Sequence, residues 1–453
     1  MANEKAMRES SIGKLLLTMS LPVIIVMVVQ VFYNVADVYF IGKTGDAMQI
    51  AAISLCSPVF SAISAFNTLI GFGGCTAVSI ALGEKRFDMV RRYSSFVVYS
   101  ALILGLILTA AILLGMPYLL PFLGTNEETA DFAKAYLQIL ALGAPLTILG
   151  GALGNTVRAD GDSKNAVIAS LSGTFTNIAL DPLFISGFHW GVRGAAFATV
   201  IGNVVSLVLL LRAVSKKEGF SLTIKDFSLR PEISLRVLGL GLPMAAGTML
   251  MGFSHAFGNR LTVTYGNDVV AARSVAGKAG MLIPMLIMGI CIGVQPAISY
   301  NFGAKNKKRL RQIVFGVGLV AVCVGSVLAL LCFLFRREIV MAFINDASIA
   351  DIGEKMMLGT IVGAPLFGVY QMCSTYLQGT GKVSYATTTS LLRQGIVYIP
   401  VLYAMEALFG LTGIIFCQPV TDVISTVVAL IFCKIWNRQM NQTPLTKTVA
   451  ETL

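Results

Sequence analysis

The sequence predicts an all-α polytopic membrane protein in which twelve transmembrane helices form two pseudo-symmetric six-helix bundles. Two observations carry this fold class. The 453 residues are 56% hydrophobic and only 13% charged, with a mean hydropathy of +0.78, whereas soluble globular chains carry roughly 25% charged residues. Apolar stretches recur over the whole length, and short segments of the first half reappear in the second half at a steady spacing.

The apolar stretches are long enough for helices that cross the hydrocarbon core of a bilayer, which takes about 20 residues. Glycines and prolines inside several of them favour bent helices and close helix contacts. We expect the twelve spans near residues 15–41, 51–82, 93–118, 132–157, 165–187, 191–212, 236–264, 272–302, 312–335, 355–378, 384–405 and 411–436.

The basic residues indicate how the chain is oriented, because Lys and Arg favour the cytoplasmic side of a membrane. Most of the 34 Lys and Arg residues lie in the even-numbered connections and at the termini, as in GEKRFDMVRR (83–92) and GAKNKKRLR (303–311). The odd-numbered connections hold Lys43, Lys134, Arg193, Arg273, Arg336, Arg337 and Lys355. We therefore expect a multi-pass protein of the cytoplasmic membrane with both termini inside, and no removed signal peptide. The net charge of +11 is then a topology signal, so no nucleic-acid partner is expected.

The chain contains an internal repeat with an offset of about 220 residues. Matching segments are SLP (20–22) and GLP (241–243), LGAPL (142–146) and VGAPL (362–366), and GVRG (191–194) and GLTG (410–413). Six spans per copy is an even number, so the two copies have the same orientation, and parallel repeats of this kind are a transporter architecture. We expect lobes at 1–212 and 236–436, a cytoplasmic linker at 213–235 and a cytoplasmic tail at 437–453.

No catalytic or metal-binding cluster is visible in the sequence. The eight cysteines sit singly in apolar segments, and His189 and His255 are far apart, whereas metal sites need ligands at paired spacings. We expect no metal, no cofactor and no enzymatic activity. A polytopic membrane enzyme is the alternative class, but it would require a catalytic cluster at a membrane face.

Two acids stand inside the predicted spans of the first half. Asp37 lies in the first span and Asp181 in the fifth, and ionisable residues in hydrocarbon are costly and functional by default. In the repeat, Asp37 falls opposite Gly258 and Asp181 opposite Ile399. Because neither acid is duplicated, we interpret both as functional. The alternative is a neutral acid that is hydrogen-bonded to a backbone carbonyl or a hydroxyl.

Polar side chains accompany these acids. Tyr33 lies four residues before Asp37, and Asn177 lies four residues before Asp181, so each shares a helix face with its acid. Thr199 lies one turn from Asn203 in the sixth span. Carboxylates, an amide and hydroxyls in one bundle can hold a proton or a small hard cation such as Na⁺.

The charges inside the second half are different. Arg260, Lys278 and Arg393 are basic, and Asp422 is acidic. In one interpretation, Asp422 pairs with one of these bases, or the groups lie close enough to the membrane interface to reach it. In the other, they line a cavity and influence which substrate binds.

At these residues the chain resembles the multidrug and toxic compound extrusion (MATE) family, in particular its DinF-like bacterial branch. The motifs that carry the resemblance are SLP (20–22), YNVAD (33–37), RADGDSK (158–164), NIALDP (177–182) and GAAFAT (194–199). The resemblance covers essentially the whole chain. It implies a secondary active efflux transporter that exports amphipathic, often cationic organic compounds by alternating access, in exchange for H⁺ or Na⁺.

The resemblance also implies roles for single residues. It maps a first-lobe site for H⁺ or Na⁺ onto Asp37, Asn177, Asp181 and Thr199, with Tyr33 nearby. Pro22 matches a proline at which the first helix is proposed to bend, and a static kink is the alternative. Other branches place acids in the second lobe, where this chain has His255 and neutral residues, so no second-lobe cation site is expected.

A second set of residues is expected to line a substrate cavity. Methionine supplies adaptable apolar surface for loose recognition, although any single methionine can equally be a packing residue. The set consists of Asn203, His255, Met281, Met285, Arg393 and Asp422.

The sequence leaves open a second transport function besides drug export. A flippase for a lipid-linked precursor would use the basic residues of the second half to bind a pyrophosphate head group, but such relatives commonly have more than twelve helices. We expect small amphipathic substrates, a lipid environment and a monomer. The residues do not separate H⁺ from Na⁺, because the same oxygen ligands serve both.

Overall fold

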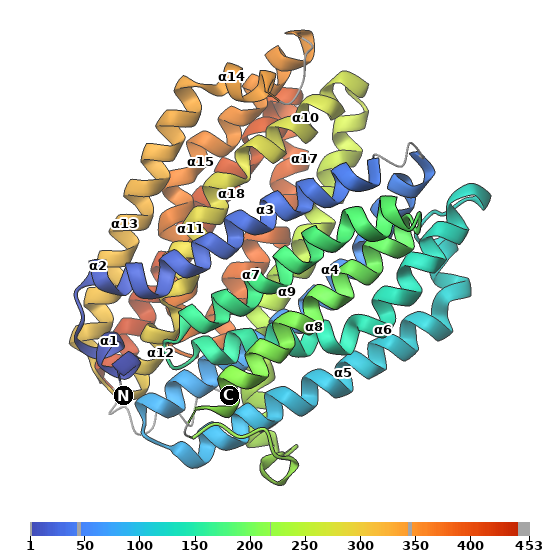
Figure 1. Cartoon of the computed structure of the whole chain (residues 1–453). Helices are drawn as coiled ribbons and strands as arrows, with labels where there is room; N and C mark the ends of the chain where they lie inside the picture. Colours follow the sequence, from blue (N-terminus) through green and yellow to red (C-terminus); the bar gives the residue numbers. More distant parts are fainter. Residues whose placement is uncertain (1, 43–46, 218, 343–346, 443–453) are drawn as a thin grey trace. The chain divides into compact units, whose positions relative to one another are not determined.

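The computed structural model describes residues 2–42, 47–217, 219–342 and 347–442. Within these ranges the side chains of residues 2–5, 32, 34–39, 41, 42, 47, 267, 347 and 348 are not described. The regular elements over the described ranges are all helical (Figure 1). Twelve helical stretches there are long and apolar enough to cross a membrane, from Ile12–Val31 to Leu411–Gln442. The predicted all-helical fold class with twelve spans is confirmed.

The first repeat contains six longer helices and several short ones. Two π-helical segments, η1 and η2, interrupt the first and fifth spans. The elements are α1 (Ala2–Glu9), α2 (Ile12–Leu15), η1 (Leu16–Ser20), α3 (Leu21–Gly42), α4 (Ala47–Gly83), α5 (Phe87–Phe122), α6 (Glu127–Arg158), α7 (Ser163–Asp181), η2 (Pro182–Gly187), α8 (Val192–Ser215) and the 3₁₀ turn η3 (Ile224–Asp226).

The second repeat follows the same plan, with a π-helical segment, η4, in the eleventh span. Its elements are α9 (Pro231–Val263), α10 (Asn267–Gly280), α11 (Leu282–Gly293), α12 (Gln295–Gly303), α13 (Lys307–Leu334), α14 (Arg336–Met341), α15 (Ala347–Gly379), α16 (Val383–Leu391), η4 (Leu392–Ile396), α17 (Tyr398–Phe409) and α18 (Leu411–Gln442).

The contacts divide the chain into two compact units. Unit 1 contains the chain up to Met7 and Ile25–Ala245, and unit 2 contains Arg8–Ile24 and the chain from Ala246 onward. In unit 1, α6 packs against α4, α5 and α8, while α7 packs against α8 (Figure 1). In unit 2, α15 packs against α10, α13 and α18, and α17 packs against α18. The lobes predicted at 1–212 and 236–436 follow the repeat, and those boundaries stay a prediction.

Two of the long helices, α3 and α9, belong partly to each unit, and each contains a proline near the change. Pro22 lies three residues before unit 1 resumes at Ile25, and Pro243 lies three residues before unit 2 resumes at Ala246. A proline removes one backbone hydrogen bond of the helix, and here the π-helical turn η1 directly precedes α3. Bending at Pro22 stays a prediction.

The first part of α9 is bound into unit 1 by a reciprocal glycine contact with α4. A Cβ atom on Gly241 would overlap the carbonyl oxygen of Leu69, and a Cβ atom on Gly73 would overlap the carbonyl oxygen of Val237. Only glycine allows two helix backbones to approach so closely. Unit 2 contains the corresponding contact between η1 and α11, because a Cβ atom on Gly293 would lie 2.5 Å from the Cα atom of Ser20.

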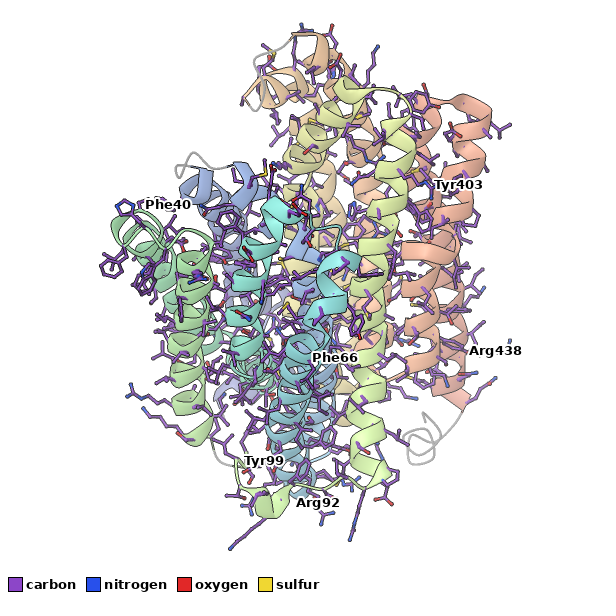
Figure 2. All side chains as sticks on the ribbon, turned by 90° about the vertical axis from the view of Figure 1, so that its right-hand side faces the viewer. Phe40, Phe66, Arg92, Tyr99, Tyr403 and Arg438 are labelled. Atoms are coloured by element: carbon purple, nitrogen blue, oxygen red, sulfur yellow. The ribbon has the colours of Figure 1, made fainter. Side chains whose placement is uncertain are left out.

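The segment between α8 and α9 is held against α5 in unit 1. Ser95 donates a hydrogen bond to the carbonyl of Thr223 (2.8 Å), and the Tyr99 hydroxyl donates one to the carbonyl of Leu222 (3.0 Å). Figure 2 shows Tyr99 beside this segment. The rings of Phe96 and Phe227 stack 6.1 Å apart. The predicted linker is therefore packed on the bundle along part of its length.

We predict that Gly241→Ala destabilises the protein, because the added methyl group would push α9 away from α4. Overpacking of this kind costs about 1–3 kcal/mol. The measurement is thermal unfolding of the purified full chain in detergent.

Gly252→Ala is the matched control, because Gly252 lies in the same helix and has no atom within 4 Å of an added Cβ. It should be neutral or slightly stabilising, since alanine is the better helix former. Equal unfolding temperatures for the two variants would contradict the close-approach argument.

Candidate functional site

The candidate site of unit 1 begins with a close contact between α7 and α8. A Cβ atom on Gly202 would lie 2.6 Å from the carbonyl oxygen of Gly173, and a Cβ atom on Gly173 would lie 2.6 Å from the carbonyl oxygen of Gly202. Two glycines facing each other let the helix backbones touch. One turn away, this contact brings Asn177 of α7 within reach of Thr199 of α8.

Three of the predicted site residues meet at the Thr199 hydroxyl. The Nδ2 atom of Asn177 donates a hydrogen bond to it (3.3 Å), and the Tyr33 hydroxyl lies 3.5 Å away. Thr199 donates its own proton to the carbonyl of Ala195 (3.0 Å). The structure therefore joins α3, α7 and α8 through one hydroxyl group.

Asp181 is the acid of this region that the structure describes. It is the last residue of α7, lies one turn after Asn177, and is wholly buried at 0% exposure. Pro182 and the π-helical segment η2 follow it, and such segments occur often at functional sites. The Oδ1 atom of Asn177 is buried and has no hydrogen-bond partner among the described residues.

The backbone of Asp37 lies in α3, but its side chain is outside the described residues. The structure therefore does not test whether the Asp37 carboxylate joins the group. Asn203 does not join it, because its Nδ2 atom donates a hydrogen bond to Thr147 of α6 (2.9 Å). Its predicted role in a cavity stays a prediction.

The chemistry of this group is that of an oxygen site for a small cation or a proton. A buried carboxylate needs a compensating partner inside the membrane. Carboxylate, amide and hydroxyl oxygens are ligands for hard cations. Among the described residues, no group of three or more His, Cys, Asp or Glu residues could hold a metal ion.

In unit 2 the structure pairs Arg393 with Asp422. The Nε atom of Arg393 lies 2.8 Å from Oδ1 of Asp422, and both side chains are almost buried, at 12% and 4% exposure. Gln418 donates a second hydrogen bond to the same oxygen (2.9 Å). The guanidinium group lies over the rings of Phe367 (4.4 Å) and Tyr370 (5.1 Å).

This pair shows that Asp422 is paired with one of the bases, as the first interpretation expected; the role of the two residues in a substrate cavity stays a prediction. Arg260 and Lys278 are exposed, as expected for bases that reach an interface. Sequence reasoning missed Gln418, although its place four residues before Asp422 puts both on one helix face. It missed Phe367 and Tyr370 because no spacing links them to Arg393.

The remaining predicted cavity residues do not join this pair. His255 is exposed, Met281 is 43% exposed and Met285 is half-buried. None of the three hydrogen-bonds to Arg393 or Asp422 in the described part of the chain. Their role in a substrate cavity stays a prediction.

A charged cluster outside the spans was also missed. Lys217, beyond the end of α8, lies 2.6 Å from Asp160 and 3.1 Å from Asp162 of the RADGDSK segment. Burial raises the pKa of Asp160 despite the nearby ammonium group. Burial would also raise the pKa of Asp162, but Lys217 and hydrogen bonds from Asn165 outweigh it and hold this pKa below its ordinary value. The two acids are visible in the sequence, but their distant partner is not.

Comparison with known proteins gives matches over nearly the whole chain. The family model MatE matches residues 22–183 and again 243–404. The two matches have equal length and start 221 residues apart, in agreement with the internal repeat.

Among curated proteins, the multidrug export protein MepA of Staphylococcus saprophyticus is 33% identical over 424 residues, covering 93% of this chain and 94% of that protein. MepA of Staphylococcus aureus strain MRSA252 is 32% identical over 427 residues, with coverage of 93% and 94%.

Solved structures share the fold. A crystal structure of MATE in complex with MaL6 has a TM-score of 0.92 at 23% identity, covering 98% of this chain and 100% of that one. A crystal structure of MATE in the bent conformation has a TM-score of 0.91 at 24% identity, with 99% of both chains covered.

We predict that breaking the Arg393–Asp422 pair costs more than losing both charges. Arg393→Met or Asp422→Leu should each destabilise the protein by about 3–5 kcal/mol, because one buried charge loses its partner. The double variant Arg393→Met/Asp422→Leu should recover most of this loss. Thermal unfolding of the full chain measures the cycle.

The control for this cycle is the exposed pair Arg337–Asp351, whose side chains are both 57% exposed. Arg337→Met should cost less than about 1 kcal/mol. If the double variant of Arg393 and Asp422 loses as much stability as the two single variants added together, the two buried charges are not coupled.

We predict that Lys217→Met lowers stability at neutral pH and that this difference shrinks in acid. The lowered pKa of Asp162 contributes stability above its unfolded-state pKa of about 3.9, and this contribution is lost as the pH falls through the folded-state value. Unfolding temperatures at pH 7 and below pH 4 test this.

Lys216→Met is the control, since Lys216 is exposed and makes no ion pair in the described residues. A loss for Lys217→Met that does not change with pH would indicate that Asp162 is not the group that titrates.

Proposed function

The chain belongs to the MatE family, and from this premise we propose that it is a secondary active exporter of amphipathic, often cationic organic compounds, driven by exchange for H⁺ or Na⁺. Family membership identifies a multi-pass membrane transporter and not an enzyme. The export of many drugs is the function named for its MepA relatives. The assignment to the DinF-like branch is a finer proposal of ours.

The observation that carries the proposal is the buried oxygen group of unit 1. Asp181 is wholly buried in a membrane span, and Asn177 presents a buried carbonyl oxygen without a hydrogen bond among the described residues. A carboxylate that cannot reach water is stabilised by binding a proton or a metal cation. A proton or cation that binds to this carboxylate and leaves it again would be the coupling ion of the transporter.

In the proposed exchange, the carboxylates of Asp37 and Asp181 bind the cationic substrate and the coupling ion in turn. When the carboxylates of Asp37 and Asp181 are ionised, they favour binding of a cationic substrate. When H⁺ or Na⁺ neutralises them, that attraction is lost and the substrate is released. Moving one charge through the membrane potential supplies roughly 2.3 kcal/mol per 100 mV, so the ion gradient can drive export.

Alternating access requires a part that moves, and α3 is our candidate. It carries Tyr33 and Asp37, and it follows the π-helical turn η1 and Pro22. A change of occupancy near Asp37 could therefore alter the bend of the helix that carries it. We further propose cytoplasmic termini, from the distribution of Lys and Arg, and a monomer.

The flippase alternative depended on free basic groups in the second half. Arg393 is paired with Asp422 and lies over two aromatic rings, so it is not available to a pyrophosphate group. The exposed Arg260 and Lys278 are the basic groups left for that function.

We predict that Asp181→Asn and Asp37→Asn each abolish ion-driven efflux in proteoliposomes while the protein stays folded. The amide keeps the shape of the carboxylate but cannot carry its charge. Dye efflux under an imposed pH gradient, and separately under an Na⁺ gradient, identifies the coupling ion.

Asp131→Asn is the control, because Asp131 is an exposed acid of α6 in the same unit. It should transport like the parent protein. Parent rates in both Asp37→Asn and Asp181→Asn would disprove the proposed coupling site.

A further inference from the structure

Unit 2 has a pocket between the start of α13 and the end of α18. Its volume is about 470 Å³. The side chains that line it are Lys307, Lys308, Arg311, Gln312 and Asn441. The Nζ atom of Lys307 donates a hydrogen bond to the carbonyl of Met440 and so joins the two helix ends. The other four lining residues are exposed, so the pocket is open to a ligand from outside.

The pocket is positively charged. Three of its five lining residues are basic and none is acidic. The first turn of α13 holds no acid either, and the N–H groups at a helix start add partial positive charge. Among the described residues, none of the three bases forms an ion pair. The pocket therefore favours an anion, and phosphate oxygens accept strong hydrogen bonds from ammonium and guanidinium groups.

An apolar surface continues from the pocket along the same face of α13. Phe315 and Leu319 follow Arg311 at intervals of four residues, and they are 77% and 55% exposed. Residues four apart lie on one side of a helix, about 6 Å apart along its axis. Because α13 is one of the twelve candidate spans, these side chains face the hydrocarbon while the bases lie at its edge. A ligand that matches both parts has an anionic head and apolar chains.

The repeat gives the pocket a counterpart in unit 1. GEK (83–85) reappears as GAK (303–305), and the lysine that ends each segment has a left-handed backbone, with φ of 59° and 58°. Two residues after each lysine, α5 and α13 begin. The starts of these two helices are therefore equivalent, with an offset of 220 residues.

The counterpart in unit 1 is not a basic pocket. In place of Lys307 and Lys308, unit 1 has Phe87 and Asp88. The segment after α8 also covers this place, because a Cβ atom on Gly219 would lie 3.2 Å from the ring of Phe87. Orientation in the membrane requires basic residues in a connection, but it does not require an open pocket. The difference between the copies points to a ligand of unit 2.

We propose that this pocket binds an anionic phospholipid, with its phosphate group against Lys308 and Arg311 and its acyl chains along Phe315 and Leu319. Lys307 forms the wall on the side of α18, to which it is already bonded. Basic pockets at the edge of the hydrocarbon bind anionic head groups. Under the orientation proposed above, the lipid belongs to the cytoplasmic leaflet. A bound lipid contacts both helix ends and so stabilises unit 2, whatever compound is exported.

The first test is thermal unfolding of the purified full chain in detergent with increasing amounts of phosphatidylglycerol. A ligand that binds the folded state raises the unfolding temperature, so we expect a saturable rise that phosphatidylcholine does not produce at the same mole fraction. Glycerol phosphate and inorganic phosphate lack acyl chains and should produce no rise. An equal rise with phosphatidylcholine or with either phosphate, or no rise with phosphatidylglycerol, would overturn the proposal.

The second test removes two bases of the pocket, in Lys308→Gln/Arg311→Gln. Both side chains are exposed, so without lipid the variant should unfold near the temperature of the parent protein. The mole fraction of phosphatidylglycerol that gives half of the rise should increase roughly 25-fold, because each base near an anionic membrane surface contributes about a fivefold factor. An unchanged dependence on this lipid would overturn the role given to the pocket.

Arg91→Gln/Arg92→Gln is the matched control. Both arginines are exposed and lie near the start of α5, the counterpart of α13, and their replacement removes the same two charges. Figure 2 shows Arg92 at the lower end of the bundle. This variant should keep the dependence of the parent protein on phosphatidylglycerol. A loss equal to that of the pocket variant would show that total positive charge attracts the lipid, and would overturn the proposal.

Discussion

The cost of burying charge and polarity in hydrocarbon is the constraint on which the rest of this structure depends. A charged or polar group there needs a partner, because water is absent. The protein meets this requirement differently in its two units. Unit 1 joins an amide and two hydroxyl groups of α3, α7 and α8 one turn from the buried Asp181, and we propose that an exchangeable cation is the partner there. Unit 2 uses partners from its own chain, in the Arg393–Asp422 pair and in the hydrogen bond from Arg273 to Thr262.

Close backbone packing makes these sites possible. Gly173 and Gly202 bring α7 to α8 in unit 1, and Gly258 makes space for a guanidinium in unit 2. Other glycines bind the first part of α9 into unit 1 and the start of the first span into unit 2. In both helices the change of unit follows a proline by three residues. The repeat thus supplies one scaffold, and a few side chains give its two copies different buried polar groups.

Much of the candidate site could be predicted from the sequence, because intramembrane acids are rare enough to be noticed. Asn177 and Thr199 were expected beside Asp181, and the structure joins them to each other and to Tyr33. The contact of Gln418 with Asp422 follows from their spacing of four residues in one helix, but those of Lys217 and Arg273 could not be predicted. Each of these two depends on a partner farther away in the chain or on the missing side chain of a glycine, and no local spacing encodes such a contact.

The sequence by itself determined the number of spans, the repeat and the acids that need an explanation. These follow from apolar length and residue type, which act locally along the chain. Only the tertiary structure decided which charges are paired. Asp422 could have faced a cavity, but packing places it against Arg393. Arg273 could have reached the interface, but the space above Gly258 admits it between α9 and α10. A charge inside a membrane pairs with the group that lies close to it, and the distances between groups are set only when the helices pack.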